Sequence, residues 1–348
     1  MDYPAARCDV TTQIVNVSEL IPTWNWLAHR FPADQLSWKH CSINLAHGRL
    51  PQLRMPLNRA NAALAARRLV RNHSGRSIIV SHGPRPALYV EVLARPTTSQ
   101  SPHLAFSFNF TDLPAGARRT LMSRYFKRVD RFVVASTVER HVYSEYFQIA
   151  AGRIDLLLWS IQPPLQELSK PARFNDEPYI CAVGSQARDY ETLIEAMRRI
   201  PAIKLVLVAG PDALPRGPIP ANVKVLTDVP LSDAMNVLAH SLFMVLPLRD
   251  SLVPCGHVTV VSAMHMGKAI LATNSSGLHD YLIGGTNAEF FAAQDPRQLA
   301  DKIELLFTQP SLCRRLGDSG LAFARQNCTE DNAVEYFRRY LKDNGLAA

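Results

Sequence analysis

The sequence predicts an α/β protein of two domains, each built on a parallel sheet with helices on both faces. At 348 residues the chain exceeds the size at which a single hydrophobic core keeps growing. Its second half alternates short, continuously apolar segments with segments of helical periodicity, and several apolar segments end in glycine. Continuous apolar strands between helices are typical of parallel sheets that are buried on both faces.

The second half carries the clearer pattern. There we expect strands at 179–183, 204–210, 223–229, 242–248 and 268–273, and helices at 189–200, 231–240, 256–267, 296–308 and 310–327. The first half repeats the scheme more weakly, with strands expected at 12–17, 77–81, 103–108 and 131–136 and Arg-rich helices at 57–72 and 115–128.

The domain boundaries follow from composition. The stretch 161–177 is rich in proline and polar residues and is the expected linker. We therefore expect an N-terminal domain over 1–165 and a C-terminal domain over 166–330. The final segment, 331–348, is expected to be a helix that packs back on the N-terminal domain.

Composition excludes several classes of protein. Hydrophobic residues make up 47% of the chain and charged residues 20%, as in ordinary globular proteins. No run of about 18 uninterrupted apolar residues is present, and the first residues lack the apolar core of a secretory signal. The six cysteines are scattered without a CxxC pair, which argues against a zinc site or a disulfide framework. We expect a cytoplasmic protein without a bound metal or cofactor.

The net charge of +8 is unevenly distributed. Residues 1–170 hold 21 Lys and Arg against 11 Asp and Glu, whereas residues 171–348 hold 17 against 19. The basic excess predicts an anionic partner for the N-terminal domain, and we expect peripheral contact with an anionic inner membrane face or a lipid-linked acceptor. Nucleic acid is disfavoured, because no aromatic-basic stacking pattern accompanies the charge. The alternative is an Arg-rich, merely solvated surface.

Two strand–helix junctions in the second half carry the residues that suit phosphate binding. At the first, Gly184 allows a close turn and Arg188 sits just before a helix, although Asp189 also reads as an ordinary helix cap. At the second, Gly256 opens a helix whose first turn holds His257 and Thr259. Free amides at a helix start attract phosphates. A histidine at such a place is more often structural than catalytic.

The segment GHVTVVSAMHMGKAILATNSSGLHDYL (256–282) resembles the donor site of the large glycosyltransferase family 4, which has the GT-B fold. Ala263, Met264, Gly267, Lys268, Gly277 and Asp280 occupy motif positions of that family. The resemblance covers most of residues 75–340 and extends over further segments at 77–84, 128–147, 183–197 and 204–211.

The resemblance implies two Rossmann-like domains that face each other across a cleft. It implies a hexosyltransferase that moves a sugar from a UDP- or GDP-linked donor to an acceptor hydroxyl without a metal, in bacterial polysaccharide or glycolipid assembly. The residues expected at the donor are Gly184, Ser185, Arg188, Gly210, Gly256, His257, Val258, Thr259, Ser262 and Lys268.

The sequence departs from the family at two glutamates, where it has Pro254 and Ser262, and Ser185 stands where the family has an arginine. Asp250 or Asp280 could supply a carboxylate instead. These departures leave two alternatives open. One is a sugar-nucleotide-binding protein without catalysis, and the other is an inverting transferase of the exopolysaccharide type. A dinucleotide-dependent oxidoreductase is set aside, because no GxGxxG follows any expected strand.

The candidate catalytic residues lie in the first half. His82 ends an expected strand, and by resemblance it lies at the transferred sugar. Asp112 follows another strand and is the candidate base of an inverting reaction. The simpler interpretations are a packing residue for His82 and a turn or cap residue before Pro114 for Asp112.

Overall fold

A computed structural model describes residues 12–18, 25–31, 36–42, 51–162, 177–249 and 254–346. The expected linker 161–177 lies almost wholly outside these ranges. The chain divides into two compact units, each described by itself below. The N-terminal unit comprises Met1–Ala135, Glu139–Leu157 and Ala333–Ala348, and the C-terminal unit comprises Ser136–Val138 and Leu158–Asn332.

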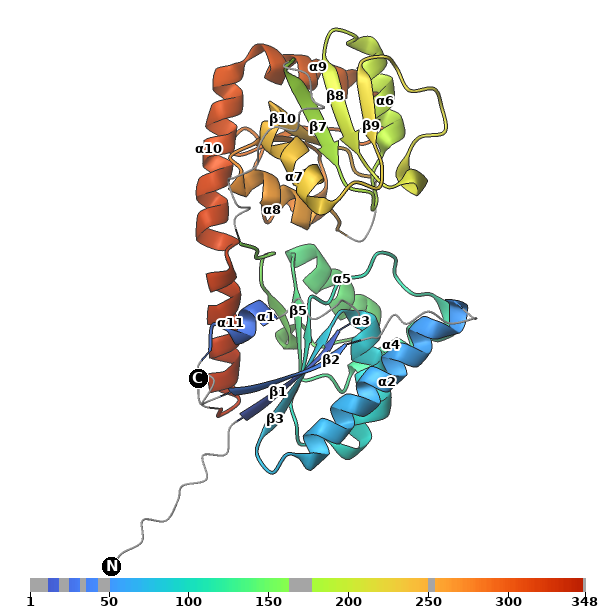
Figure 1. The fold of residues 1–348 in the computed structure, drawn as a ribbon, viewed down its shortest axis with the longest axis vertical. Coiled ribbons are helices and arrows are strands. Elements are labelled where there is room, and N and C mark those ends of the chain that lie inside the picture. The colour runs from blue at the N-terminus through green and yellow to red at the C-terminus, as the bar shows by residue number, and fades with distance from the viewer. Residues whose placement is uncertain are drawn as a thin grey trace, which may run out of the picture. The chain divides into compact units, whose positions relative to one another are not determined.

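The N-terminal unit is built on a six-stranded sheet in the order β2-β1-β3-β4-β5-β6 (Figure 1). All its strands are parallel, and they are β1 (Thr12–Ser18), β2 (Leu36–Ser42), β3 (Ser77–His82), β4 (His103–Phe106), β5 (Arg131–Val134) and β6 (Ile154–Leu156). The chain places β2 on one side of β1 and the strands from β3 onward on the other side, so the direction of strand addition reverses between β1 and β3. In open α/β sheets, such a switch point leaves a crevice at the carboxyl ends of the strands.

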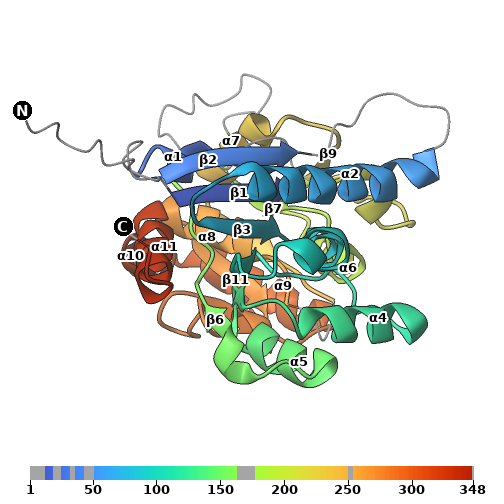
Figure 2. The ribbon, with the colours of Figure 1, turned by 90° about the horizontal axis from the view of Figure 1, so that it is seen from below.

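Helices cover both faces of this sheet, as Figure 2 shows from below. On one side lie α1 (Asn25–Ala28) and α11 (Glu330–Asp343), and on the other lie α2 (Pro51–Asn72), α3 (Pro84–Tyr89), α4 (Gly116–Phe126) and α5 (Thr137–Phe147). Three short irregular helices complete the unit, namely η1 (Val90–Ala94, a π-helix), η2 (Arg95–Thr97) and η3 (Ala151–Arg153). From Ala333 onward, α11 belongs to this unit, and its residues Val334, Phe337 and Leu341 pack with Ile14 and Ile78 of the sheet.

A polar chain is sealed inside the N-terminal unit. The Ser81 hydroxyl lies 2.8 Å from Nε2 of His103, whose Nδ1 lies 2.6 Å from the carboxylate of Glu91 in the π-helix. All three residues are 0% exposed. A substrate has no route to such a site, so we interpret the chain as a structural tie between the sheet and η1. Buried polar groups of this kind are stable only when they are hydrogen-bonded.

The C-terminal unit has a second parallel sheet, in the order β12-β11-β10-β7-β8-β9. Its strands are β7 (Tyr179–Val183), β8 (Lys204–Val208), β9 (Val223–Leu226), β10 (Phe243–Leu246), β11 (Ala269–Thr273) and β12 (Glu289–Phe291). With the strands of this unit numbered 1 to 6 along the chain, the order is 6-5-4-1-2-3. Read from the β9 edge it is 3-2-1-4-5-6, which is the order of dinucleotide-binding folds. Its switch point lies between β7 and β10.

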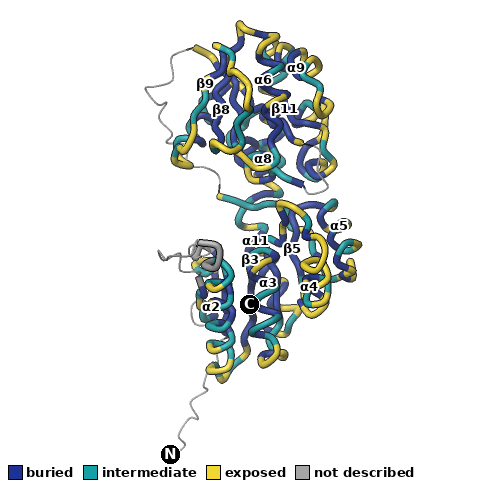
Figure 3. Tube along the Cα trace, turned by 90° about the vertical axis from the view of Figure 1, so that its right-hand side faces the viewer, coloured by how far each residue is buried: buried dark blue, intermediate teal, exposed yellow. Residues whose placement is uncertain are grey.

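Two hydrophobic layers bury the second sheet (Figure 3). One face packs on α7 (Leu231–His240) and α8 (His257–His265), and the other packs on α6 (Tyr190–Arg199) and α9 (Pro296–Thr308). The remaining helices are α10 (Pro310–Asn327), η4 (Pro211–Ala213) and η5 (Ser276–Leu278). The fold class predicted from the sequence, two parallel sheets with helices on both faces, is confirmed.

Most predicted elements of the C-terminal unit are found within a few residues of their expected bounds. The sequence patterns missed β2, β6, β12, α3 and α5. Lys39 and His40 interrupt the apolar run of β2, which is an edge strand, and β6 and β12 have three residues each. No helix in the described ranges is long and apolar enough to cross a bilayer.

The closest backbone approach at any glycine in the described ranges lies between α10 and the turn before β11. A Cβ added at Gly317 would lie 2.1 Å from the carbonyl oxygen of Gly267. We expect Gly317→Ala to lower the free energy of unfolding of the C-terminal unit by about 1–3 kcal/mol, because two backbones would have to separate. Gly320→Ala is the matched control on the same helix. Its added Cβ would lie 3.5 Å from the Met264 side chain, and we expect it to be neutral or slightly stabilising. Urea unfolding followed by circular dichroism checks both, and equal stability of the two variants would contradict this packing.

Candidate functional site

The turn after β7 is held in an unusual backbone conformation at the switch point of the C-terminal sheet. Gly184 has φ 116° and Ala187, although not a glycine, has φ 55°. Backbone bonds attach the turn to the strand ends on either side, since the amide of Gly184 donates to Val208 and the carbonyl of Ala187 accepts from Arg249. The side chain of Asp189 then caps α6 by accepting from the amide of Thr192. The turn therefore fixes the position of Arg188.

Arg188 is a buried cation without a carboxylate partner. It is 5% exposed, and its guanidinium donates to two backbone carbonyls, Gln186 at 2.8 Å and Val183 at 3.4 Å. A third bond of 3.2 Å runs to the hydroxyl of Thr259 in α8, while Nε has no partner. Among the described residues none forms an ion pair with it. Burial lowers the pKa of Arg188 from its ordinary value, but an arginine stays protonated in proteins.

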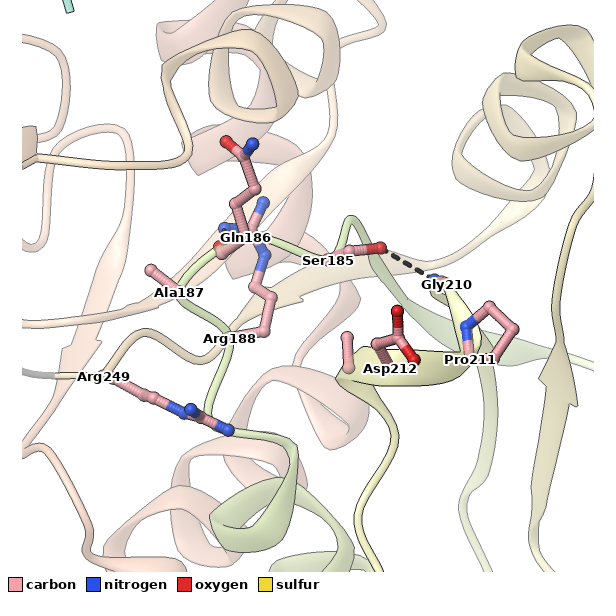
Figure 4. Close-up of a pocket in the computed structure, with 9 residues that line it drawn as sticks. Ser185, Gln186, Ala187, Arg188, Gly210, Pro211, Asp212 and Arg249 are labelled. Carbon is pink, nitrogen blue, oxygen red and sulfur yellow. Dashed lines mark hydrogen bonds between the residues drawn. The ribbon is translucent and has the colours of Figure 1, made fainter. Parts of the chain in front are cut away.

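A small cavity opens beside this residue. It has a volume of about 260 Å³ and is formed by the loops that follow β7, β8 and β10 (Figure 4). Its lining consists of Ser185, Gln186, Ala187, Arg188, Gly210, Pro211, Asp212, Ala213 and Arg249. The hydroxyl of Ser185 accepts from the amide of Gly210 at 2.7 Å, which ties the first two loops together. Gly184, Ser185, Arg188 and Gly210 of the predicted donor site are thus brought together.

The start of α8 lies next to the guanidinium. Gly256 has φ 98°, and a Cβ added there would lie 3.8 Å from Nη1 of Arg188. No side chain caps this helix, so its first amides are left for another acceptor. Thr259 faces Arg188 and Val258 is 50% exposed. Of the residues predicted for the donor site, Gly256, Val258 and Thr259 therefore lie at this helix start, next to Arg188.

The structure does not bring three of the predicted side chains to this site. The ring of His257 is turned into the protein, where Nε2 lies 3.0 Å from the carbonyl oxygen of Gly277, so only its backbone faces the helix start. The hydroxyl of Ser262 is buried and donates to the carbonyl of Val258. Lys268 precedes β11 and donates to the carbonyl of Ser241. It lies at the amino edge of the sheet, whereas ligands bind at the carboxyl edge.

Two aspartates, Asp250 and Asp280, were predicted as substitutes for the missing glutamates. The structure does not place either carboxylate in the site. The carboxylate of Asp280 accepts from the amide of Thr137 at 2.8 Å and from its hydroxyl at 3.0 Å. Asp250 lies outside the described residues. Within the described ranges no cluster of three or more His, Cys, Asp and Glu side chains could hold a metal ion.

In the N-terminal unit, His82 ends β3 at the switch point between β1 and β3. Burial, and then the neighbouring His40, lower the pKa of His82 to about 3. Its imidazole is therefore neutral at physiological pH and only weakly basic. The buried Asn16 of β1, which pairs with His40 of β2, has no hydrogen-bond partner for its side-chain amide. Asp112 is exposed in the loop after β4.

Sequence reasoning missed six residues of the cavity, namely Gln186, Ala187, Pro211, Asp212, Ala213 and Arg249. Arg249 could have been found, because it follows a predicted strand and the carboxyl ends of parallel strands share one edge. The positive φ of Ala187 has no sequence signal, since an alanine rarely adopts it. Asn16 is also detectable only in the structure, because it sits inside an otherwise apolar strand.

Among the described residues, a buried cation without a carboxylate partner lies at the switch point of a doubly wound sheet and next to a helix start, an arrangement that suits a phosphate-bearing ligand. Comparison with known families makes the class specific. Residues 177–309 match the family described as glycosyl transferases, group 1. The C-terminal unit therefore resembles group 1 glycosyl transferases over these residues, and the two parallel sheets agree with the GT-B fold expected from the sequence.

Solved structures agree with this fold over both units. Sucrose-phosphate synthase from Thermosynechococcus elongatus is similar with a TM-score of 0.74 at 16% identity, covering 96% of this chain and 99% of that one. Anabaena HepE in complex with UDP-glucose gives 0.71 at 12% identity, covering 95% and 99%. The lipopolysaccharide outer core galactosyltransferase WaaB gives 0.59 at 14% identity, covering 94% and 99%. No curated protein sequence is a significant match.

The glycine at the head of the turn offers a direct test of the cation site. A Cβ added at Gly184 would lie 2.6 Å from Nη2 of Arg188, at a φ that favours glycine. We expect Gly184→Ala to displace the guanidinium and to weaken the binding of inorganic pyrophosphate at least tenfold by calorimetry. Gly285→Ala is the matched control, because φ is 73° there but nothing lies within 4 Å of the added Cβ. Both variants should lose about 1–3 kcal/mol of stability. Equal pyrophosphate affinities in the two variants would show that Arg188 does not contact the anion.

Proposed function

We propose that the C-terminal unit binds the diphosphate of a UDP- or GDP-linked sugar at Arg188 and the start of α8, and that the protein transfers this sugar to an acceptor hydroxyl. The observation that carries the proposal is the buried guanidinium of Arg188, which has no carboxylate partner among the residues that the structure describes. A buried charge is costly unless it is paired. An anionic ligand would supply the counter-charge that no described residue provides for Arg188.

The same geometry suits the reaction. When the acceptor oxygen attacks the anomeric carbon, the bond from that carbon to the diphosphate breaks and negative charge develops on the leaving group. Arg188 and the amides at the start of α8 would stabilise that charge in place, which is the type of effect that contributes most to many enzymes. Positive charge from the chain itself makes a metal-independent transfer the simplest mechanism.

The similar structures support the choice of donor and pathway. HepE has been solved with UDP and with UDP-glucose, and WaaB is a galactosyltransferase of the lipopolysaccharide outer core. By analogy we propose a nucleotide-sugar donor and a glycan or lipid-linked acceptor in bacterial polysaccharide or glycolipid assembly. The protein would then work in the cytoplasm, at the inner face of the membrane.

For the chemical step we propose Asp112 as the general base of an inverting reaction. His82 is the weaker candidate, because a group with a pKa of about 3 holds an abstracted proton poorly. Its neutral ring is better suited to donating or accepting a hydrogen bond with the sugar. Pro254 and Ser262, in place of two family glutamates, favour one competing function, a protein that binds sugar nucleotides without transferring them.

The donor site is tested by Arg188→Met, which keeps a long side chain and removes the charge. At about 100 times its dissociation constant, a ligand of the wild type should add roughly 2.7 kcal/mol of stability. We expect one class among UDP-, GDP-, ADP- and TDP-sugars to raise the melting temperature, and the variant to lose this shift. The melting temperature of the unliganded variant, measured in the same scan, is the reference for its shift. Arg199→Met, at an exposed site on α6, is the control. A shift retained in Arg188→Met would overturn the assignment.

Catalysis is tested by Asp112→Asn in a transfer or donor-hydrolysis assay with EDTA present. If Asp112 is the base, turnover should fall by about 100-fold or more while the nucleotide-dependent thermal shift is unchanged. The anomeric configuration of the product should be inverted. Unchanged turnover, or a retained configuration, would exclude Asp112 as the base. Nucleotide binding without turnover in the wild type would favour the non-catalytic alternative.

A further inference from the structure

The turn after β4, residues 107–114, alternates buried and exposed side chains at the carboxyl edge of the N-terminal sheet. Phe108 and Phe110 are buried in the unit, whereas Asn109 and Asp112 are exposed. The proposed base therefore lies on a turn whose neighbouring side chains anchor it from below. How firmly the turn is held decides how well that base is placed.

Aromatic packing holds the buried side of this turn. The rings of Phe108 and Phe126 meet edge-on with 5.0 Å between their centroids, and the ring of Phe110 stacks on that of Phe147 at 5.2 Å. Next to them Ser107, although not a glycine, has φ 49°. A serine keeps such a backbone conformation only where its surroundings fix it. The structure around the turn therefore determines its shape.

Helix α5 holds the same turn by hydrogen bonds. The amide of Phe110 donates to the hydroxyl of Tyr143 at 3.1 Å, and the hydroxyl of Tyr146 donates to the carbonyl of Pro114 at 2.7 Å. Together with Glu139, these two tyrosines are spaced at i, i+4 and i+7, so all three lie on one face of the helix. That face of α5 thus contacts the turn at its middle and at its end.

The third contact from this helix face is a buried carboxylate. Glu139 is 0% exposed. One of its oxygens accepts from Nδ2 of Asn109 at 2.7 Å and from the hydroxyl of Tyr143 at 3.4 Å, and the other accepts from the amide of Ala135 at 2.9 Å. Buried carboxylates are tolerated only when donors surround them. Because Ala135 directly follows β5, Glu139 joins the turn after β4 to the end of the neighbouring strand.

The polarity of the pair formed by Asn109 and Glu139 permits one arrangement. An ionised carboxylate only accepts hydrogen bonds, so the amide of Asn109 must turn its NH2 group inward. Asn109 stands between two buried phenylalanines and three residues before Asp112. Its bond to Glu139 therefore fixes the exposed stretch of the turn that leads to the base. A base needs such support, because a misplacement of about 1 Å can cost roughly 100-fold in rate.

We propose that Glu139 is a positioning residue for the transfer reaction, which holds Asp112 at the acceptor hydroxyl through Asn109 and the turn. The side chain of Glu139 is wholly buried, so it acts through these residues and does not touch the substrate. The inference deepens the proposed function and rests on it, since it takes Asp112 as the base. A purely structural tie, like the one between Ser81 and Glu91, would stabilise the unit without affecting turnover.

The test exchanges the two groups of the pair. In Asn109→Asp two carboxylates face each other, and in Glu139→Gln the new carboxamide has one accepting oxygen, so either Asn109 or the amide of Ala135 loses its acceptor. Each single variant should lose about 10- to 100-fold in turnover in the transfer or donor-hydrolysis assay. In the double variant Asn109→Asp/Glu139→Gln, the carboxamide donates to the new carboxylate and accepts from Ala135. Its turnover should therefore return to within about threefold of the wild type.

Further measurements separate positioning from a general loss of folding. All variants should keep the nucleotide-dependent thermal shift. Hydrogen exchange of peptides that cover 107–114, followed by mass spectrometry, should be faster in each single variant and return to the wild-type rate in the double variant. In an Asp112→Asn background, Glu139→Gln should cause little further loss of turnover, because the group that it positions is gone. Glu145→Gln, at an exposed site on the same helix, is the matched control and should behave as the wild type does.

Several results would overturn the inference. These are unchanged turnover in either single variant, an equal loss in Glu145→Gln, a full further loss in the Asp112→Asn background, or a double variant that regains slow exchange but not turnover. The last result would mean that Asn109 itself touches the substrate. A wild type that shows nucleotide shifts but no turnover with any donor would reject the proposed transfer and, with it, the catalytic role of Glu139. Unaffected variants of an active wild type would reject the role of Glu139 alone, so the two failures are distinguishable.

Discussion

The buried guanidinium of Arg188 is the group around which the switch point of the C-terminal unit is arranged. It is held by carbonyls of its own turn and by Thr259 of α8, so it links the end of β7 to the start of a helix that follows β10. Glycines at 184 and 256 leave room around it, and each has a positive φ. The turn, the sheet order and the start of α8 thus converge on one charge that no described carboxylate pairs, which is why we propose an anionic ligand there.

The two units use related architectures for different purposes. In the C-terminal unit the polar groups of the switch point are phosphate-binding in type, with a cation and free amides. At the corresponding point of the N-terminal unit lie neutral groups, namely His40, His82 and Asn16. The positive charge of the N-terminal unit lies instead on exposed arginines of α2, α3 and α4. This separation suits an enzyme whose donor is strongly anionic and whose reacting acceptor group is a neutral hydroxyl.

Periodicity and apolar runs predicted the elements of the C-terminal unit well, because its central strands are buried and most of its helices are amphipathic. The same reasoning missed β2, whose Lys39 and His40 break the apolar run, and the helices after β3, where Pro84 and Pro86 conceal helical periodicity. At the site, glycines and the arginine after β7 were found from their place at strand ends. Lys268 was misplaced by motif resemblance, although the direction of its strand puts it at the opposite edge.

The sequence by itself determined the α/β class, the alternation of strands and helices and the concentration of basic residues in the first half. It did so because these depend on local periodicity and composition. Only the tertiary structure decided that Arg188 is buried without a carboxylate among the described residues, and that Ser262 and His257 turn inward. Those properties depend on which residues distant in sequence become neighbours, and a charge becomes uncompensated only through the neighbours that folding gives it.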